Sequence, residues 1–382
     1  MKIGFDAKRA FLNTSGLGNY SRNVVDSLIR YFPQHEYVLF TPETSDLYVP
    51  AGEQQNAAKL SIVTPRGIWK TFHSVWRSSK IITDLNRQKI NLYHGLSNEL
   101  PFGIKRSGIK SIVTIHDLIF LRYPEFYSAA DRNIYHRKSK RACEEADHII
   151  SISIQTKEDM MDFYRIPEEK ISVVYPAIQN SFFEKAIPEQ LVDTQKRFHL
   201  PGKFVLCVGT IEERKNLLAV VKAIRLIPKG EEVFLVIVGR ETVYKRKVDE
   251  YINQHDLRDR VIFLKDVPNS QLPFIYMKAG VVVYPSRYEG FGLPVAEALA
   301  CGTPVIANDL KVLREAGNDA AKFIDTEDYQ LMAETILEII NQEKIQTEVR
   351  RAADHVAKFR PGYQAEQLSI LYSQVLSDSS KQ

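Results

Sequence analysis

The sequence predicts an α/β protein made of two successive doubly wound parallel-sheet domains. The chain has 382 residues, more than one hydrophobic core usually organises, and about 150 residues per domain suggests two domains. Short runs rich in Val and Ile recur along it, separated by segments of helix length, which is typical of a parallel sheet covered on both faces. Hydrophobic residues make up 44% and charged residues 26%, so the composition is that of a globular protein with two full cores.

We expect one set of strands in each half of the chain, because each apolar run is followed by a segment long enough for a helix. In the first half the candidate strands are residues 2–6, 37–40, 61–64, 91–94, 111–116, 148–153 and 171–175. In the second half they are residues 204–208, 233–238, 261–264, 281–284, 304–308 and 322–324. This alternation predicts two Rossmann-like units.

The domain boundary should lie between Pro176 and Pro201, where prolines flank a polar segment. We therefore expect a first domain over residues 1–185, a second over 200–360 and a hinge between them. A Pro-Gly break then precedes a last amphipathic helix in segment 361–382. That helix either packs on its own domain or crosses back to the first.

The cysteines indicate a reducing compartment. Cys143, Cys207 and Cys301 are the only three, and none is spaced like a metal site or a redox pair. We expect buried, reduced thiols in a cytoplasmic protein. The chain also runs from Met1 straight into a strand, and no signal peptide or membrane-spanning helix is predicted.

The positive charge is concentrated in residues 59–141, which contain 16 basic and 5 acidic side chains interleaved with aromatic residues. Such a patch can meet an anionic membrane, a nucleic acid or an acidic acceptor. The alternative is a basic face that is simply solvated.

The most informative loop follows the strand at 281–284. It reads Glu289-Gly290-Phe291-Gly292-Leu293 and enters a helix with Pro294 in its first turn. Open α/β sheets bind ligands at this carboxyl edge, and a helix N-terminus favours a phosphate there.

Two glutamates flank this helix start: Glu289 lies on the loop and Glu297 about one turn inside the helix. A carboxylate accepts two hydrogen bonds, which suits the vicinal hydroxyls of a ribose. The pair could hold opposite ends of one extended ligand. The alternative is an ordinary turn residue and a solvated helix residue.

A second loop, after the strand at 204–208, carries Gly209 and the adjacent cations Arg214 and Lys215. Arg offers a planar fork and Lys a point charge, and together they suit a diphosphate. The alternative is a surface loop with two ordinary charges.

The first domain offers two weaker signals. A turn with Gly16 and Gly18 opens the first helix, but Ser21 occupies the third glycine position of a dinucleotide fingerprint. His116 ends one strand and His94 another, where each could reach a cleft. A lone His is more often a structural residue.

These loops resemble the signature of retaining GT-B glycosyltransferases of family 4 (glycosyl transferases group 1), whose members share two glutamates separated by seven residues. The following Ala300–Ile306 segment is also similar to that family. The resemblance extends from the first strand to about Phe359. It implies a GT-B fold, in which an N-terminal acceptor-binding domain and a C-terminal nucleotide-sugar-binding domain face a central cleft.

The resemblance also implies roles for individual residues. Glu297 would bind the nucleotide ribose, Glu289 would face the donor sugar, and Arg214 and Lys215 would grip the diphosphate. The expected catalytic residues are His116, Glu289, Arg214 and Lys215. The expected donor-binding residues are Gly16, Gly18, Gly209, Arg214, Lys215, Gly239, Glu289, Gly290, Phe291, Gly292, Leu293 and Glu297.

The reaction implied is transfer of a sugar from a nucleoside diphosphate to an acceptor hydroxyl with retention of the anomeric configuration. The resemblance leans toward mannosyltransferases that build polysaccharide or lipid-linked glycans. No Asp-x-Asp or His-carboxylate cluster is visible, so we expect no metal and no cofactor besides the donor substrate. We expect the acceptor to be a glycan or a lipid-linked glycan, and the protein to be cytoplasmic, with peripheral contact through residues 59–141 at the inner face of a membrane.

Three alternatives remain open. Another GT-B reaction, such as nucleotide-sugar epimerisation or phosphorolysis, is the nearest. An NAD-dependent dehydrogenase should have a compact glycine fingerprint and an acid ending the second strand, but Phe40-Thr41-Pro42 stands there. A noncatalytic nucleic-acid binder would explain the basic patch but would not need the two loops, so we expect no nucleic-acid partner.

Overall fold

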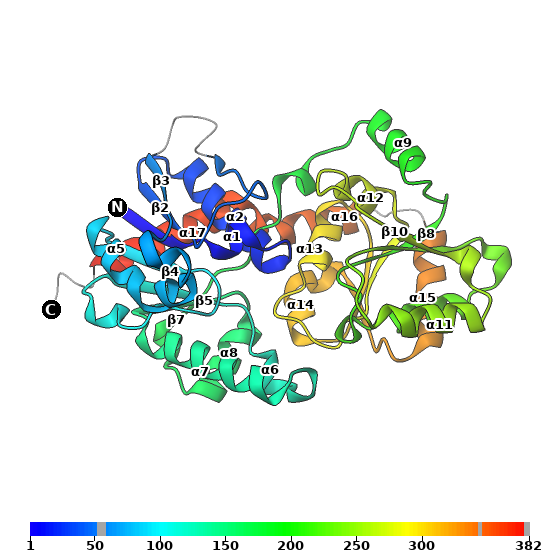
Figure 1. The fold of residues 1–382 in the computed structure, drawn as a ribbon. Helices are drawn as coiled ribbons and strands as arrows, with labels where there is room; N and C mark the ends of the chain where they lie inside the picture. The colour runs from blue at the N-terminus through cyan, green and yellow to red at the C-terminus, as the bar shows by residue number, and fades with distance from the viewer. Residues whose placement is uncertain (52–58, 343–345, 378–382) are drawn as a thin grey trace. The chain divides into compact units, whose positions relative to one another are not determined.

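The computed structural model describes residues 1–51, 59–342 and 346–377, which form two compact units (Figure 1). Unit 1 contains Met1–Ala177 together with the segment from Lys358, and unit 2 contains Ile178–Ala357. The last five residues of the expected C-terminal segment, 378–382, lie outside the described residues.

Unit 1 contains a seven-stranded sheet in the order β3-β2-β1-β4-β5-β6-β7, and all neighbouring strands are parallel. Each strand overlaps one of the seven predicted from the sequence. The strands are β1 (Lys2–Asp6), β2 (Glu36–Phe40), β3 (Lys59–Val63), β4 (Leu92–Gly95), β5 (Lys110–Ile115), β6 (His148–Ser151) and β7 (Ile171–Val173).

Helices cover both faces of this sheet. On one face α1, α2 and α17 pack together, and on the other α5, α7 and α8 bury their apolar side chains against the strands. The helices of unit 1 are α1 (Lys8–Leu12), α2 (Gly16–Tyr31), α4 (His73–Val75), α5 (Ile81–Arg87), α6 (Ile119–Arg122), α7 (Ala129–Glu145), α8 (Ile154–Tyr164) and α17 (Pro361–Ser377).

Unit 2 contains a six-stranded parallel sheet in the order β10-β9-β8-β11-β12-β13. These strands overlap the six predicted for the second half, so the prediction of two Rossmann-like parallel-sheet domains is confirmed. The strands are β8 (Phe204–Val208), β9 (Phe234–Val238), β10 (Val261–Leu264), β11 (Val281–Tyr284), β12 (Val305–Asn308) and β13 (Lys322–Ile324).

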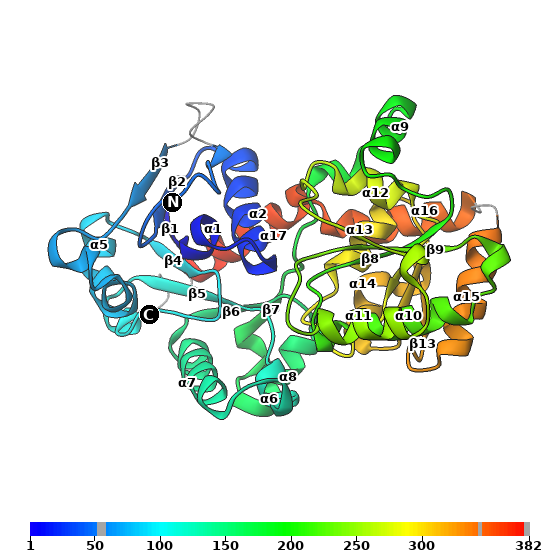
Figure 2. The ribbon, with the colours of Figure 1, turned by 45° about the vertical axis from the view of Figure 1, so that its right-hand side comes forward.

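The helices of unit 2 also lie on both faces of their sheet (Figure 2). One face packs on α10, α11 and α15 through a continuous apolar core, and α12, α13, α14 and α16 contact one another on the other. The helices are α9 (Pro188–Arg197), α10 (Leu217–Leu226), α11 (Lys245–Gln254), α12 (Leu272–Lys278), α13 (Leu293–Ala300), α14 (Lys311–Gly317), α15 (Tyr329–Asn341) and α16 (Gln346–Val356).

Residues 178–185, which the sequence analysis places at the end of the first domain, cluster with unit 2. The reason is local packing: the ring of Phe182 lies edge-on against Tyr276 of α12, with 5.6 Å between ring centroids. Unit 2 therefore begins at Ile178, which lies within the interval between Pro176 and Pro201, and it includes the last eight residues expected for the first domain.

The last helix belongs to unit 1. It packs along α2, as the views in Figures 1 and 2 agree. Gln364 donates a hydrogen bond to the carbonyl of Tyr175 (2.8 Å), and the Tyr372 hydroxyl lies 2.7 Å from Nδ1 of His94. Helix α17 thus completes the packing of unit 1, the unit that the N-terminal residues form.

Candidate functional site

The two motif loops of unit 2 meet at the carboxyl edge of its sheet. They follow β8 and β11, which are hydrogen-bonded neighbours, and the N–H of Arg287 donates to the carbonyl of Arg214 (2.9 Å). Parallel pairing of the two strands therefore brings the cations of one loop to the glutamate of the other, although 74 residues separate Lys215 from Glu289.

Glu289 is the centre of this cluster. Its carboxylate accepts from Lys215 Nζ at 2.5 Å and from the Tyr284 hydroxyl at 2.8 Å, and it lies 3.0 Å from Nη1 of Arg214. Only 7% of the residue is exposed. Burial opposes ionisation, but Lys215 and then Arg214 outweigh it and lower the pKa of Glu289 to about 2. The carboxylate is therefore charged at any physiological pH.

The guanidinium of Arg214 is held in a fixed orientation. It donates to the carbonyl of Tyr288 (2.7 Å) and to Glu212 (2.6 Å). Burial disfavours the charge, but Glu289 and Glu212 raise the pKa of Arg214 above its ordinary value. The cluster therefore presents a preorganised fork of the kind that binds phosphate oxygens.

Glu297 occupies a different environment, although it lies only eight positions further along the chain. It is half-buried on α13, and its carboxylate accepts a 2.9 Å hydrogen bond from the Tyr276 hydroxyl. Burial raises the pKa of Glu297 to about 7, because the Tyr276 hydrogen bond and the more distant Lys215 compensate it only in part. The two glutamates are thus in opposite electrostatic states.

Glycines allow the loops of this edge to approach closely. Gly209 has φ of +141° and Gly292, the N-cap of α13, has φ of +111°. A Cβ on Gly239 would lie 1.8 Å from the Gly209 carbonyl oxygen, so only glycine fits there. Gly290 and Leu293 are partly exposed on this loop, whereas Phe291 is 3% exposed and its ring belongs to the core.

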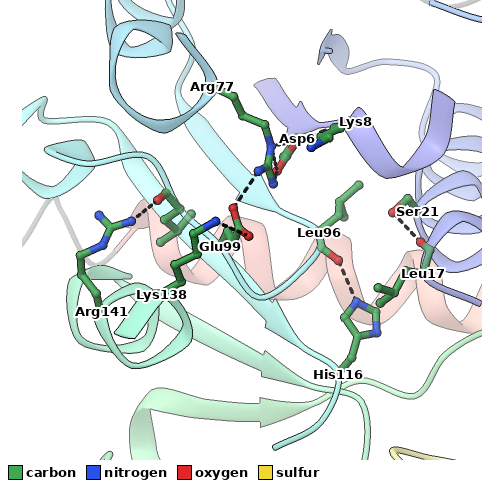
Figure 3. A network of polar contacts seen from close by, with 11 residues as sticks. Asp6, Lys8, Leu17, Ser21, Arg77, Leu96, Glu99, His116, Lys138 and Arg141 are labelled. Atoms are coloured by element: carbon green, nitrogen blue, oxygen red, sulfur yellow. Dashed lines mark hydrogen bonds and ion pairs between the residues drawn. The ribbon is translucent and has the colours of Figure 1, made fainter. Parts of the chain in front are cut away.

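His116 marks the corresponding edge of unit 1, immediately after β5. Its Nε2 lies 2.8 Å from the carbonyl oxygen of Leu96 (Figure 3), so that nitrogen carries the proton. The His116 ring meets Tyr20 edge-on, with 4.6 Å between the ring centroids. Burial is the main reason that the pKa of His116 falls to about 4; the Leu96 carbonyl opposes the shift and the charge of Arg9 adds to it. His116 is therefore neutral at pH 7.

The glycine turn of α2 contains two different kinds of glycine. A Cβ on Gly18 would lie 1.9 Å from the carbonyl oxygen of Asn13, whereas one on Gly16 would meet nothing within 4 Å. Gly18 is therefore required by the fold, and the space above Gly16 is open. Ser21 donates to the carbonyl of Leu17 (2.8 Å) within the helix.

His94, whose place at the end of a strand could have let it reach a cleft, is instead a structural residue. His94 is fully buried, and its two ring nitrogens contact the Tyr372 hydroxyl (2.7 Å) and the Thr114 hydroxyl (2.8 Å). Thr114 in turn lies 3.1 Å from the Tyr20 hydroxyl. His94 is the centre of a structural polar network between the sheet, α2 and α17.

Two tyrosines that hold the glutamates were not predicted from the sequence. Tyr284 is the last residue of β11, so its place at the carboxyl end of a predicted strand was a usable signal. Tyr276 lies on α12, 21 residues before Glu297, and nothing in the sequence points to their contact.

The basic stretch 59–141 is partly neutralised by the fold. Eight of its cations lie within 4.0 Å of a carboxylate. Exposed apolar side chains stand among the others, including Ile68, Phe72 and Val75. Among the described residues no helix is long and apolar enough to span a membrane, and no group of three His, Cys, Asp or Glu side chains is placed to hold a metal ion.

Comparisons with known proteins assign each half of the chain to a family model. The model described as Glycosyltransferase Family 4 matches residues 14–182, and the model described as Glycosyl transferases group 1 matches residues 191–356. The second match includes every unit 2 residue of the candidate site, and the first includes His116 and the glycine turn.

Individual relatives agree with these matches. O-antigen chain mannosyltransferase B of Escherichia coli is 25% identical over 90% of this chain and 91% of its own length. O-antigen chain mannosyltransferase RfbU of Salmonella typhimurium is 26% identical over 80% and 78%, respectively. Among solved structures, HepE of Anabaena in complex with UDP superposes with a TM-score of 0.75 at 16% identity, covering 98% of this chain and all of that one. That likeness shows a shared GT-B fold.

Proposed function

This chain belongs to the glycosyl transferases of group 1, and from that membership we propose that it moves a hexose, with mannose favoured, from a nucleoside diphosphate to an acceptor hydroxyl with retention of configuration. The acceptor is a glycan or a lipid-linked glycan of polysaccharide synthesis. The mannose preference is supported by the two O-antigen mannosyltransferase relatives. A nucleotide donor is supported by the UDP bound to HepE.

The observation that carries this proposal is the cluster of Arg214, Lys215 and Glu289 at the carboxyl edge of unit 2. The single carboxylate of Glu289 pairs with both cations. A donor diphosphate brings two further negative groups to this fork and to the N-terminus of α13. Glu289 is then free to accept hydrogen bonds from the donor sugar.

Glu297 completes the donor site at the nucleoside end. Its carboxylate accepts hydrogen bonds from the two ribose hydroxyls, for which the ionised form is required. With a pKa of about 7, the acid is more than half ionised only above neutral pH. Nucleotide binding should therefore strengthen as the pH rises through 7.

His116 and the glycine turn serve the reacting end. Because its pKa is about 4, the imidazole is a neutral hydrogen-bonding group toward the donor sugar. We assign no carboxylate nucleophile. The bond from the anomeric carbon to the leaving phosphate oxygen breaks as the bond to the acceptor oxygen forms on the same face, and the leaving phosphate takes the acceptor proton. Arg214, Lys215 and the helix dipole stabilise the leaving diphosphate without a metal ion.

The location that fits this activity is the cytoplasmic face of a membrane. There the exposed apolar side chains of residues 59–141, and those cations of this stretch that make no ion pair with another described residue, would contact anionic lipid. Sedimentation with vesicles of anionic and of neutral lipid tests this point: equal binding to both would contradict it.

The function is tested by a thermal-shift panel of nucleoside diphosphates and nucleotide sugars, since a ligand of the folded form raises its melting temperature. The best donor is then incubated with acceptor, and the anomeric configuration of the product is read by NMR. Glu297→Ala should weaken nucleotide binding and Arg214→Ala should mainly slow transfer, whereas Arg225→Ala, an exposed cation of α10, is the matched control. A product of inverted configuration, or two site variants as active as the control, would refute the proposal.

A further inference from the structure

Unit 1 contains a polar cavity that the donor site does not use. It lies at the carboxyl ends of β1 and β4, has a volume of about 120 Å³ and is bordered by α7 and by the segment after α4 (Figure 3). Its charged lining residues are Asp6, Lys8, Arg77, Glu99, Lys138 and Arg141. The carboxyl edge of a parallel sheet is where α/β proteins bind ligands, so this cavity is placed for a substrate.

The two carboxylates of the cavity are already committed to Arg77. Its Nε donates to both oxygens of Asp6 (3.1 and 3.0 Å), and its Nη1 donates to Glu99 (2.7 Å). Glu99 also accepts from Lys138 (3.3 Å). Arg77 lies in a π-helical turn, Trp76–Lys80, a feature found frequently at functional sites. These contacts fix the cavity wall and balance its acids.

Lys8 lines the same cavity, but neither of the two carboxylates pairs with its ammonium group. Its backbone N–H donates to Asp6 (3.3 Å), but within the described chain its ammonium makes no hydrogen bond and no ion pair. Burial, and after it the charges of Arg77 and Arg9, lower the pKa of Lys8. An anion in the cavity would compensate a positive charge that is now held at a cost.

An apolar groove continues from the same cavity. It has a volume of about 300 Å³ and is lined by Phe102 and Ile134 together with Lys138, Arg141 and other residues of α7. Phe102, Lys138 and Arg141 border both spaces. The side chains of Phe102 and Ile134 are about half exposed (54% and 49%), although Arg141 covers one face of the Phe102 ring at 3.6 Å. A charged cavity thus opens beside an apolar surface with a basic rim.

We propose that the cavity binds the phosphate of a lipid-linked acceptor and that the groove holds the first part of its apolar chain. This inference rests on the proposed function, because it names the acceptor class of the same enzyme. Lys8 supplies the new ion pair, Arg77 supplies N–H groups that Asp6 and Glu99 do not use, and Lys138 lies at the junction with the groove. A neutral saccharide would leave the charge of Lys8 uncompensated, and a free phosphate would leave the groove empty.

The test uses the full chain and three probes: farnesyl phosphate below its critical micelle concentration, inorganic phosphate and farnesol. Both tryptophans of the protein, Trp69 and Trp76, lie in unit 1, and Trp76 directly precedes Arg77. Intrinsic fluorescence therefore reports occupancy. Farnesyl phosphate should bind at least tenfold more tightly than either other probe, and its affinity should fall with ionic strength.

Two variants separate the charge from the groove. Lys8→Gln should weaken farnesyl phosphate at least tenfold, whereas Phe102→Ser should weaken farnesyl phosphate but not inorganic phosphate. Lys59→Gln is the matched control, since Lys59 begins β3 at the opposite edge of the same sheet and its side chain is 79% exposed. Equal affinity for farnesyl phosphate and farnesol, or equal affinity of the Lys8 and Lys59 variants, would overturn the proposal.

The same protein preparation distinguishes this inference from the proposed function. A nucleotide that raises the melting temperature while farnesyl phosphate fails to bind would refute the acceptor site alone. Absence of any nucleotide response would refute the donor site, whatever the lipid probe does.

Discussion

Replacing each glutamate of the donor site with glutamine should change the stability of unit 2 in opposite directions. The unfolded chain ionises Glu297 at its ordinary pKa of 4.5, but the folded protein does so at about 7. Between these values the folded state holds a proton that the unfolded state has lost, so rising pH favours unfolding. The stabilising effect of that proton is fully present below pH 4.5 and is lost as the pH rises through 7. Glu297→Gln removes this loss.

The magnitude follows from the pKa difference. A pKa of about 7 in place of 4.5 corresponds to roughly 3 kcal/mol at 1.36 kcal/mol for each pH unit. Because Glu297 is only half-buried and water screens part of its charge, we expect about 1–2 kcal/mol of added stability in the glutamine variant at pH 8.5. For a unit of this size that raises the melting temperature by about 2–8 °C. At pH 4.5 the variant and the parent should have the same melting temperature.

Glu289 has the opposite sign. Its pKa of about 2 lies below the unfolded value, so its contribution is present above pH 4.5 and is lost as the pH falls through 2. Glu289→Gln leaves Arg214 and Lys215 without their shared carboxylate, and at pH 8.5 it should cost about 2–4 kcal/mol. The two variants thus control for each other, since both exchange one carboxylate for an amide at the same edge of the sheet.

Differential scanning calorimetry at pH 4.5 and 8.5 checks this pair of predictions. A nucleotide titration of Glu297→Gln should show affinity reduced about tenfold or more in the more stable protein, because a charged hydrogen-bond acceptor is gone. If Glu297→Gln is less stable than the parent at pH 8.5, or if its effect is the same at both pH values, the account of its burial is wrong.

Two further predictions concern unit 1. Tryptophan fluorescence reports the unfolding of this unit. Gly18→Ala should lower the free energy of unfolding by about 1–3 kcal/mol because the new Cβ meets the Asn13 carbonyl. Gly16→Ala is the matched control, and its free energy of unfolding should lie within about 0.5 kcal/mol of the parent's. Equal losses at both positions would contradict this. Tyr372→Phe removes the hydroxyl that contacts buried His94 and should lower the free energy of unfolding by about 1–3 kcal/mol; an unchanged chemical denaturation midpoint would show that the contact contributes nothing.

Much of the fold could be predicted from the sequence because each strand is a short apolar run with its own flanking breaks. Val281–Tyr284 and Phe204–Val208, for example, coincide with the observed strands. The family resemblance implied that Arg214 and Glu289 bind one donor, but their direct contact was not predicted; it arises because their loops follow the neighbouring parallel strands β8 and β11. Their individual roles remain predictions.

Contacts between elements distant in sequence could not be predicted. Arg77 reaches Asp6 across 71 positions and lies in a π-helical turn without a recognisable pattern. His94 carried the same signal as His116, a histidine ending a strand. Its contacts with Thr114 and with Tyr372, 278 residues away, distinguish this structural residue from the candidate site residue. The two glutamates of one motif also differ in the direction of their pKa shifts, because Lys215 and Arg214 pair with Glu289 whereas burial dominates at Glu297.

The membership of α17 in unit 1 has a consequence for how the protein is made. A ribosome completes residues 1–177 and must then synthesise all 180 residues of unit 2, Ile178–Ala357, before the helix that covers α2 exists. At 5–20 residues per second this interval lasts about 9–36 s. Unit 2 is continuous in sequence and can fold first. His94 gains its contact with the Tyr372 hydroxyl only after α17 has been synthesised. A chain that stops after unit 2 therefore contains all residues of unit 2 but lacks the helix that completes unit 1.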